Sequence, residues 1–132
     1  MMGDLLLEST KNSGEPEVSI LIIDDDENIT RTFSRILQKS GYQTDTAQSG
    51  AEAVRKSGSK VYDVALIDIC LSDMNGLDLL RKLTDPESRM IKIVITGFPT
   101  MADMNVHPDA FLLKPVKPQE LLSVISQKIR QA

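Results

Sequence analysis

Side chains that usually carry disulfides, zinc sites or membrane spans are scarce in this sequence of 132 residues. Its single cysteine, Cys70, excludes an internal disulfide and a cysteine-based zinc cage, as expected of a protein in a reducing, cytoplasmic compartment. No apolar run approaches the roughly 20 residues that span a bilayer, and the run Leu5-Leu6-Leu7 is too short for the apolar region of a signal peptide. The net charge of −4 argues against a nucleic-acid-binding surface. We therefore expect neither a membrane nor a nucleic acid as a partner.

What is present suffices for one folded domain. Hydrophobic residues make up 41% of the chain and charged residues 26%, a composition that excludes an extended disordered chain. Residues 1–17 mix polar, glycine and proline residues without a sustained period, so we expect a flexible N-terminal extension there. The pattern becomes regular from Val18 onward, which predicts a single domain over residues 18–132.

Short apolar runs alternate with amphipathic stretches along this domain. The runs predict five strands, over residues 18–23, 42–47, 61–67, 91–95 and 110–113. Intervening stretches carry apolar residues at helical spacing, most clearly over residues 29–37, 76–83 and 118–129. Ser49 and Glu52 match the capping-box pattern that starts a further, short helix. The alternation predicts an α/β fold, a doubly wound parallel sheet with helices on both faces.

Polar side chains follow four of the five expected strands. Asp24 and Asp25 follow the first strand, Asp68 the third, Thr96 the fourth and Lys114 the fifth. Because functional sites of open α/β sheets lie at the carboxyl ends of the strands, we expect these residues to gather at one edge. Carboxylates brought together there repel one another unless a cation lies among them. Oxygen ligands without histidine or cysteine suit a hard cation such as Mg²⁺.

The same residues could carry phosphoryl chemistry. A carboxylate can act as nucleophile and accept a phosphoryl group, and Asp68 is the candidate because it stands alone at the end of a buried strand. The adjacent pair Asp24 and Asp25 is better placed to bind a metal, while Lys114 and Thr96 could bind phosphoryl oxygens. An acid after a strand is also commonly a helix cap. Capping alone does not explain functional side chains at four strand ends.

Four stretches of the sequence resemble the receiver domains of two-component response regulators: ILIIDDDENI, YDVALIDICLSDMNGLDLL, IVITG and DAFLLKP. The resemblance runs from Val18 to Ile129 and implies a flavodoxin-like sheet with strand order 2-1-3-4-5. It also implies Mg²⁺-dependent transfer of a phosphoryl group from a sensor histidine kinase or phosphotransfer protein. The phosphorylated domain would then present a changed surface to a downstream effector or to a second copy in a homodimer. Such a domain is a signalling module rather than an enzyme with a diffusible substrate.

The resemblance also assigns roles to single residues. Asp68 matches the phosphorylated aspartate, Thr96 the switch hydroxyl, and Lys114 the lysine that pairs with the phosphoryl group. Phe111 matches an aromatic side chain that changes rotamer on activation, and Lys114-Pro115 matches a cis peptide bond. The implied ligands of Mg²⁺ are the carboxylates of Asp24, Asp25 and Asp68 and the main-chain carbonyl of Cys70.

Two alternatives stay open at this point. The segment from Thr96 to Lys114 is about one helical turn shorter than is usual in the family, which predicts a shortened or irregular fourth helix. That shortening would suit a receiver-like interaction module that is never phosphorylated. A haloacid-dehalogenase-like phosphatase would also use a strand-end aspartate, but it requires a second acid two residues later, where this chain has Cys70.

Two further side chains bear on how long a phosphorylated form would last. The resemblance places Cys70 and Phe98 beside the path of the hydrolytic water. Neither side chain carries a carboxylate or amide that could orient a water for in-line attack. We therefore expect slow loss of the phosphoryl group.

Overall fold

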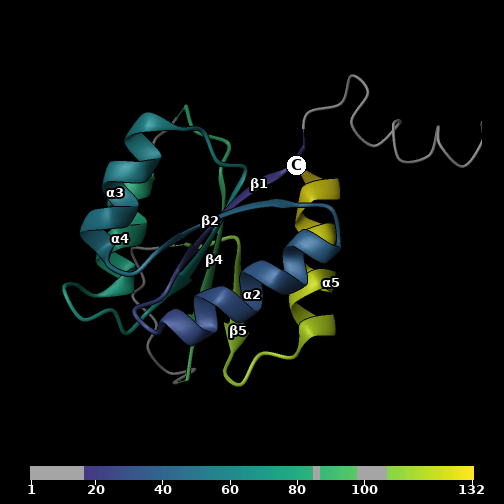
Figure 1. Ribbon diagram of the computed structural model, residues 1–132. Coiled ribbons are helices and arrows are strands. Elements are labelled where there is room, and N and C mark those ends of the chain that lie inside the picture. The colour runs from purple at the N-terminus through teal and green to yellow at the C-terminus, as the bar shows by residue number, and fades with distance from the viewer. Residues whose placement is uncertain (1–16, 85–86, 98–106) are drawn as a thin grey trace, which may run out of the picture.

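The computed structural model describes residues 17–84, 87–97 and 107–132. It contains one parallel sheet, in which the strands lie in the order β2-β1-β3-β4-β5 (Figure 1). The strands are β1 (Ser19–Ile23), β2 (Gln43–Ala47), β3 (Val64–Asp68), β4 (Ile91–Thr96) and β5 (Ala110–Leu113). This order confirms the predicted doubly wound, flavodoxin-like sheet.

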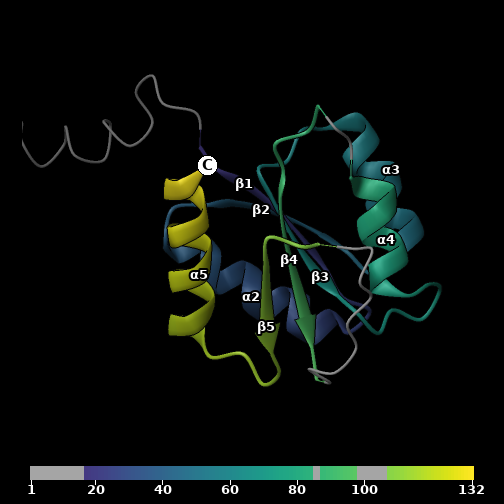
Figure 2. The same cartoon turned by 180° about the vertical axis from the view of Figure 1, so that it is seen from behind.

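Four helices among the described residues cover the sheet on both faces: α2 (Glu27–Lys39), α3 (Gly50–Ser59), α4 (Gly76–Leu83) and α5 (Pro118–Gln131). Helices α3 and α4 lie on one face, and α2 and α5 lie on the other, as the two opposite views show (Figures 1 and 2). None of these helices is long and apolar enough to cross a membrane.

Strand β1 shows why the central strands are mostly apolar. Leu21 and Ile23 pack on the side of α3 and α4, whereas Ile20 and Ile22 pack on the side of α2 and α5. All residues of β1 are buried, as are those of β3. Because alternate side chains point to opposite faces, a strand covered on both faces needs an unbroken apolar run. The carboxyl ends of these strands are therefore fixed by the core.

Local hydrogen bonds set where the helices begin and end. The side chain of Asp26 caps α2 by accepting the Asn28 N–H at 2.9 Å, and Asn75 caps α4 by accepting the Leu77 N–H at 2.7 Å. Helix α2 ends before Gly41, whose φ of 94° lies in the left-handed region that glycine adopts freely. The two caps set where the loops at the carboxyl edge of the sheet end, and the turn at Gly41 returns the chain to the amino edge, where β2 begins.

The third strand begins at Val64 rather than at Val61, which corrects the predicted range of residues 61–67. Val61 is 86% exposed and precedes the sheet. The carboxylate of Asp63 accepts the Ser19 N–H at 2.8 Å and so marks the amino edge of the sheet just before β3. The apolar side chain of Val61 extended the run in sequence without belonging to the strand.

Several predictions fall outside the described residues. The shortened or irregular fourth helix was predicted for a segment that includes residues 98–106. Of the N-terminal extension expected over residues 1–17, residues 1–16 also lie outside the described part of the chain. Phe98, expected beside the hydrolytic water, also belongs to this group. These expectations stay predictions.

Candidate functional site

Three aspartates meet at the carboxyl edge of the sheet. Asp68 is the last residue of β3, while Asp24 and Asp25 directly follow β1. These two strands are neighbours, with Ile23 paired to Ile67, so their ends lie side by side. One carboxylate oxygen from each aspartate lies within 4.8 Å of the others. Asp24 and Asp68 are only 4% and 3% exposed, whereas Asp25 faces solvent.

Main-chain donors hold the two buried carboxylates in place. The Asp26 N–H donates to Asp24 Oδ1 at 2.9 Å, and the Cys70 N–H donates to Asp68 Oδ1 at 3.2 Å. The Asp24 N–H donates to the Ala47 carbonyl at 3.0 Å, which continues the pairing of β1 with β2. It is Asp26 that caps α2, so capping does not account for Asp24 or Asp68.

Lys114 brings one positive charge to the aspartates. Its Nζ lies 3.1 Å from Asp68 Oδ1 and 3.9 Å from Asp24 Oδ2. The Lys114 N–H donates to the Thr96 carbonyl at 2.8 Å, which places the lysine directly after β5 and beside the end of β4. The Lys114-Pro115 peptide bond is cis, as the family resemblance implied.

Burial and mutual repulsion shape the protonation of this cluster. Burial is the main cause that raises the pKa of Asp24 to about 6, the charge of Asp68 adds to it, and the Asp26 N–H opposes it. Burial also disfavours the charged form of Lys114, but the hydrogen bond and charge of Asp68 outweigh this, so the pKa of Lys114 is raised. Among the described residues, the three carboxylates have one ammonium, so the cluster keeps surplus negative charge. Its oxygen donors fit a hard divalent cation.

The loop after Asp68 folds back onto the strand that precedes it. Cys70 and Asn75 form an antiparallel bridge, and the Gly76 N–H donates to the Ile69 carbonyl at 2.8 Å. A Cβ atom at Gly76 would lie 2.5 Å from the Asp68 carbonyl oxygen and from Ile69 Cα, so only glycine fits there. Sequence reasoning missed this contact; its only signal is an Asn-Gly pair at the start of a helix.

The remaining predicted residues lie at different depths. Thr96 ends β4, is 4% exposed and pairs in register with Leu113, so it lies next to Lys114 along the edge. Phe111 pairs with Val94 farther back on β5, and its side chain is 53% exposed. The structure thus gathers the aspartates, Lys114 and Thr96 at one edge and leaves Phe111 on the outer strand.

Comparisons with known proteins identify the family of this chain. The family model for the response regulator receiver domain matches residues 20–126. The response regulator ArlR of Staphylococcus aureus is 31% identical over 116 residues, which cover 85% of this chain and 52% of that protein. The chain therefore spans about half the length of the curated relatives it matches.

Solved structures of receiver domains share the fold of this chain. A CheY-like response regulator receiver domain protein from Methanospirillum hungatei JF-1 is 34% identical with a TM-score of 0.81, and the match covers 88% of this chain and 96% of that one. A second CheY-like receiver domain, from Methylobacillus flagellatus, is 26% identical with a TM-score of 0.77 and covers 85% and 98%. The chain therefore belongs to the receiver domain family of response regulators, which are regulatory modules of two-component signalling.

Proposed function

We propose that this domain accepts a phosphoryl group on Asp68 from the phosphohistidine of a sensor histidine kinase or phosphotransfer protein. The observation that carries the proposal is the buried Asp68 carboxylate at the centre of the cluster, with Lys114 Nζ 3.1 Å from Oδ1. Membership of the receiver family supports it.

The contacts of Asp68 suggest how the transfer proceeds. Among the described residues, Cys70 N–H and Lys114 both contact Oδ1, which leaves Oδ2 to attack phosphorus. A new O–P bond then forms as the P–N bond breaks, and its electron pair returns to the imidazole of the donor histidine. The Lys114 ammonium stabilises the negative charge on the phosphoryl oxygens, and the Thr96 hydroxyl donates to one of them in the phosphorylated state.

The oxygen donors at this edge are proposed to hold Mg²⁺. Its ligands would be the carboxylates of Asp24, Asp25 and Asp68 and the main-chain carbonyl of Cys70. When bound, Mg²⁺ neutralises charge on the carboxylates and on the phosphoryl group. The surplus negative charge of the cluster supports this assignment.

Phosphorylation is proposed to change the surface that the domain presents to a downstream effector or to a second copy. Thr96 would turn toward the phosphoryl group, and Phe111 would change rotamer in response. The exposed position of Phe111 on the outer strand β5 supports its role at such a surface. The response is a shift between two populated conformations rather than turnover of a diffusible substrate.

Incubation with a small phosphodonor such as acetyl phosphate and Mg²⁺, followed by intact mass measurement, tests the proposal. We expect one phosphoryl group on the wild type and none on Asp68→Asn, which is nearly isosteric and keeps the fold. Asp45→Asn removes a carboxylate of β2 outside the site and should leave phosphorylation unchanged. Phosphorylated Asp68→Asn, modified at another residue, would refute the assignment. A wild type that takes no phosphoryl group would favour the interaction module.

A further inference from the structure

The loop that joins β3 to α4 is attached at its tip to helix α3. Asp73 Oδ1 accepts the Gly50 N–H at 2.8 Å, and Asp73 Oδ2 accepts the Ala51 N–H at 3.0 Å. These amides open α3 and have no acceptor within the helix. Both hydrogen bonds hold the pKa of Asp73 below its ordinary value. One carboxylate of the acceptor loop therefore caps a helix that is distant in sequence.

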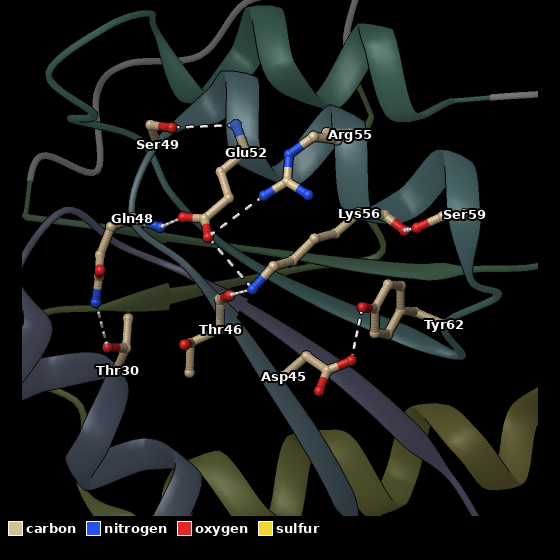
Figure 3. A network of polar contacts seen from close by, with 10 residues as sticks. All are labelled: Thr30, Asp45, Thr46, Gln48, Ser49, Glu52, Arg55, Lys56, Ser59 and Tyr62. Carbon is tan, nitrogen blue, oxygen red and sulfur yellow. Dashed lines mark hydrogen bonds and ion pairs between the residues drawn. The ribbon is translucent and has the colours of Figure 1, made fainter.

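The beginning of α3 is itself held firmly. Ser49 Oγ accepts the Glu52 N–H at 3.0 Å, which confirms the Ser49 half of the predicted capping box (Figure 3). Glu52 Oε1 accepts the N–H of Gln48 at 2.7 Å rather than that of Ser49, one residue earlier than in a strict capping box (Figure 3). Gln48 Nε2 also donates to Thr30 Oγ1 at 3.3 Å, which ties this turn to α2 (Figure 3). The loop is thus attached to a turn that is already held by its own capping hydrogen bonds and by a hydrogen bond to α2.

An apolar contact accompanies the two hydrogen bonds. A Cβ atom at Gly50 would collide with the side chain of Met74, so Met74 lies directly against the backbone at the start of α3. Met74 also packs against the core on the side of α3 and α4. The tip of the loop is therefore held to α3 by a polar contact and an apolar one.

The beginning of the loop contacts Asp68, the proposed phosphoacceptor. The bridge between Cys70 and Asn75 joins the two arms of the loop, and the Cys70 N–H donates to Asp68 Oδ1 at 3.2 Å. Because the two arms are joined, we expect a displacement at Asp73 to move the main chain of Cys70. The hydrogen bond from Cys70 to Asp68 is at the long end of the usual range, so a small displacement suffices to break it.

We propose that Asp73 is a positioning residue for phosphorylation, holding the Cys70 main chain against Asp68 by fastening the loop to α3. This inference rests on the proposed function of Asp68 and adds a residue outside its immediate contacts. Loss of the Asp73 carboxylate should weaken Mg²⁺ binding and slow phosphorylation, each by roughly tenfold. This is the lower end of the range for residues that hold a metal ligand in place without contacting the metal.

Asp73→Ala and Ser49→Ala form a matched pair for the test. Each variant removes a side-chain acceptor from the first turn of α3, but only Asp73→Ala releases the loop. We expect both to lower the unfolding temperature. Below that temperature, only Asp73→Ala should raise the Mg²⁺ dissociation constant, slow phosphorylation by acetyl phosphate and speed amide exchange at Cys70. Asp73→Asn keeps one acceptor oxygen and should fall between Asp73→Ala and the wild type.

Each outcome of this comparison decides the matter. Wild-type rates and Mg²⁺ affinity in Asp73→Ala would overturn the inference while leaving the proposed function intact. Equal losses in both alanine variants would overturn it too, because the helix cap rather than the loop would then be responsible. A wild type that takes no phosphoryl group would refute the proposed function instead. Even in that case, amide exchange tests the inference on Asp73. Unchanged exchange at Cys70 in Asp73→Ala would show that Asp73 does not hold the loop.

Discussion

Two charged regions of the domain contrast sharply. Around β2 and α3, each carboxylate has a partner. Asp45 Oδ2 lies 3.0 Å from Lys60 Nζ. It also lies 2.7 Å from the Tyr62 hydroxyl, and Glu52 Oε2 lies 3.3 Å from Lys56 Nζ (Figure 3). At the carboxyl edge of the sheet, three aspartates share a single described cation. Every carboxylate of the first region is paired with a cation, so we call it the balanced region, whereas the carboxylates of the second outnumber their described cation.

The pKa directions follow this difference. In the balanced region, the Tyr62 hydroxyl is the main cause that lowers the pKa of Asp45, and the Gln48 N–H is the main cause that lowers the pKa of Glu52. At the sheet edge, burial raises the pKa of Asp24 to about 6. Paired carboxylates support the fold, whereas a buried surplus of carboxylates costs stability and is relieved by a bound cation. The contrast separates charges that are paired within the fold from charges that are not.

The strongest way to sharpen this contrast is to add Mg²⁺. At a concentration 100 times its dissociation constant, Mg²⁺ should raise the free energy of unfolding by about 2.7 kcal/mol. Asp25→Ala should abolish most of this gain, because Asp25 is exposed and contributes a carboxylate to the cluster. Asp45→Ala, in the balanced region, should keep the full gain. Equal gains in wild type and Asp25→Ala, measured by thermal unfolding, would contradict the metal assignment.

Two glycine substitutions should change the free energy of unfolding in opposite directions. Gly76→Ala places a methyl group against the main chain of Asp68 and Ile69 and should lower the free energy of unfolding by about 1–3 kcal/mol. Gly58→Ala, in α3, meets nothing within 4 Å and should raise it by about 0.5–1 kcal/mol. Urea denaturation measures both. Equal effects of the same sign would show that the close approach at Gly76 is unimportant.

The smallest effect is expected from Tyr62→Phe, which removes the hydrogen bond to Asp45. Stability at neutral pH should fall by about 0.5–1 kcal/mol. Burial, with help from Asp45, raises the pKa of Tyr62 to about 12, so its hydroxyl remains a donor at neutral pH.

The stability lost in Tyr62→Phe should depend on pH, and the lowered pKa of Asp45 sets the direction. Because the pKa of Asp45 is lowered in the folded state, its contribution is present above its unfolded pKa of about 3.9 and disappears as pH falls through the folded pKa. The difference in the free energy of unfolding between wild type and Tyr62→Phe should therefore shrink in acid. Urea denaturation at neutral pH and in acid would measure it. A difference that is constant or grows in acid would exclude Asp45 as the partner.

Much of the site could be predicted from the sequence because two simple rules apply to it. Buried strands give continuous apolar runs, so the ends of β1 and β3 were recognisable. The short β5 was recognisable by its apolar sequence, although only Leu112 in it is buried. Parallel strands then bring their carboxyl ends to one edge, which placed Asp24, Asp68 and Lys114 together. Both rules depend on local pattern and chain direction alone.

Contacts between loops could not be predicted in the same way. Asp73 reaches Gly50 and Ala51 across 22 or more positions of sequence, and no periodic pattern encodes that distance. The close approach of Gly76 to Asp68 likewise depends on how the loop turns back. Val61 shows the opposite failure, since an apolar residue extended a run beyond the strand that it precedes.

Mapping the modified residue tests the central claim most directly. The wild type would be phosphorylated with acetyl phosphate and Mg²⁺, reduced with borohydride to convert an acyl phosphate to homoserine, and digested for peptide mass analysis. We predict homoserine at position 68 alone, and none when Mg²⁺ is chelated. Homoserine at position 24, 25 or 45, or equal labelling without Mg²⁺, would contradict the assignment of Asp68 as a cation-dependent phosphoacceptor.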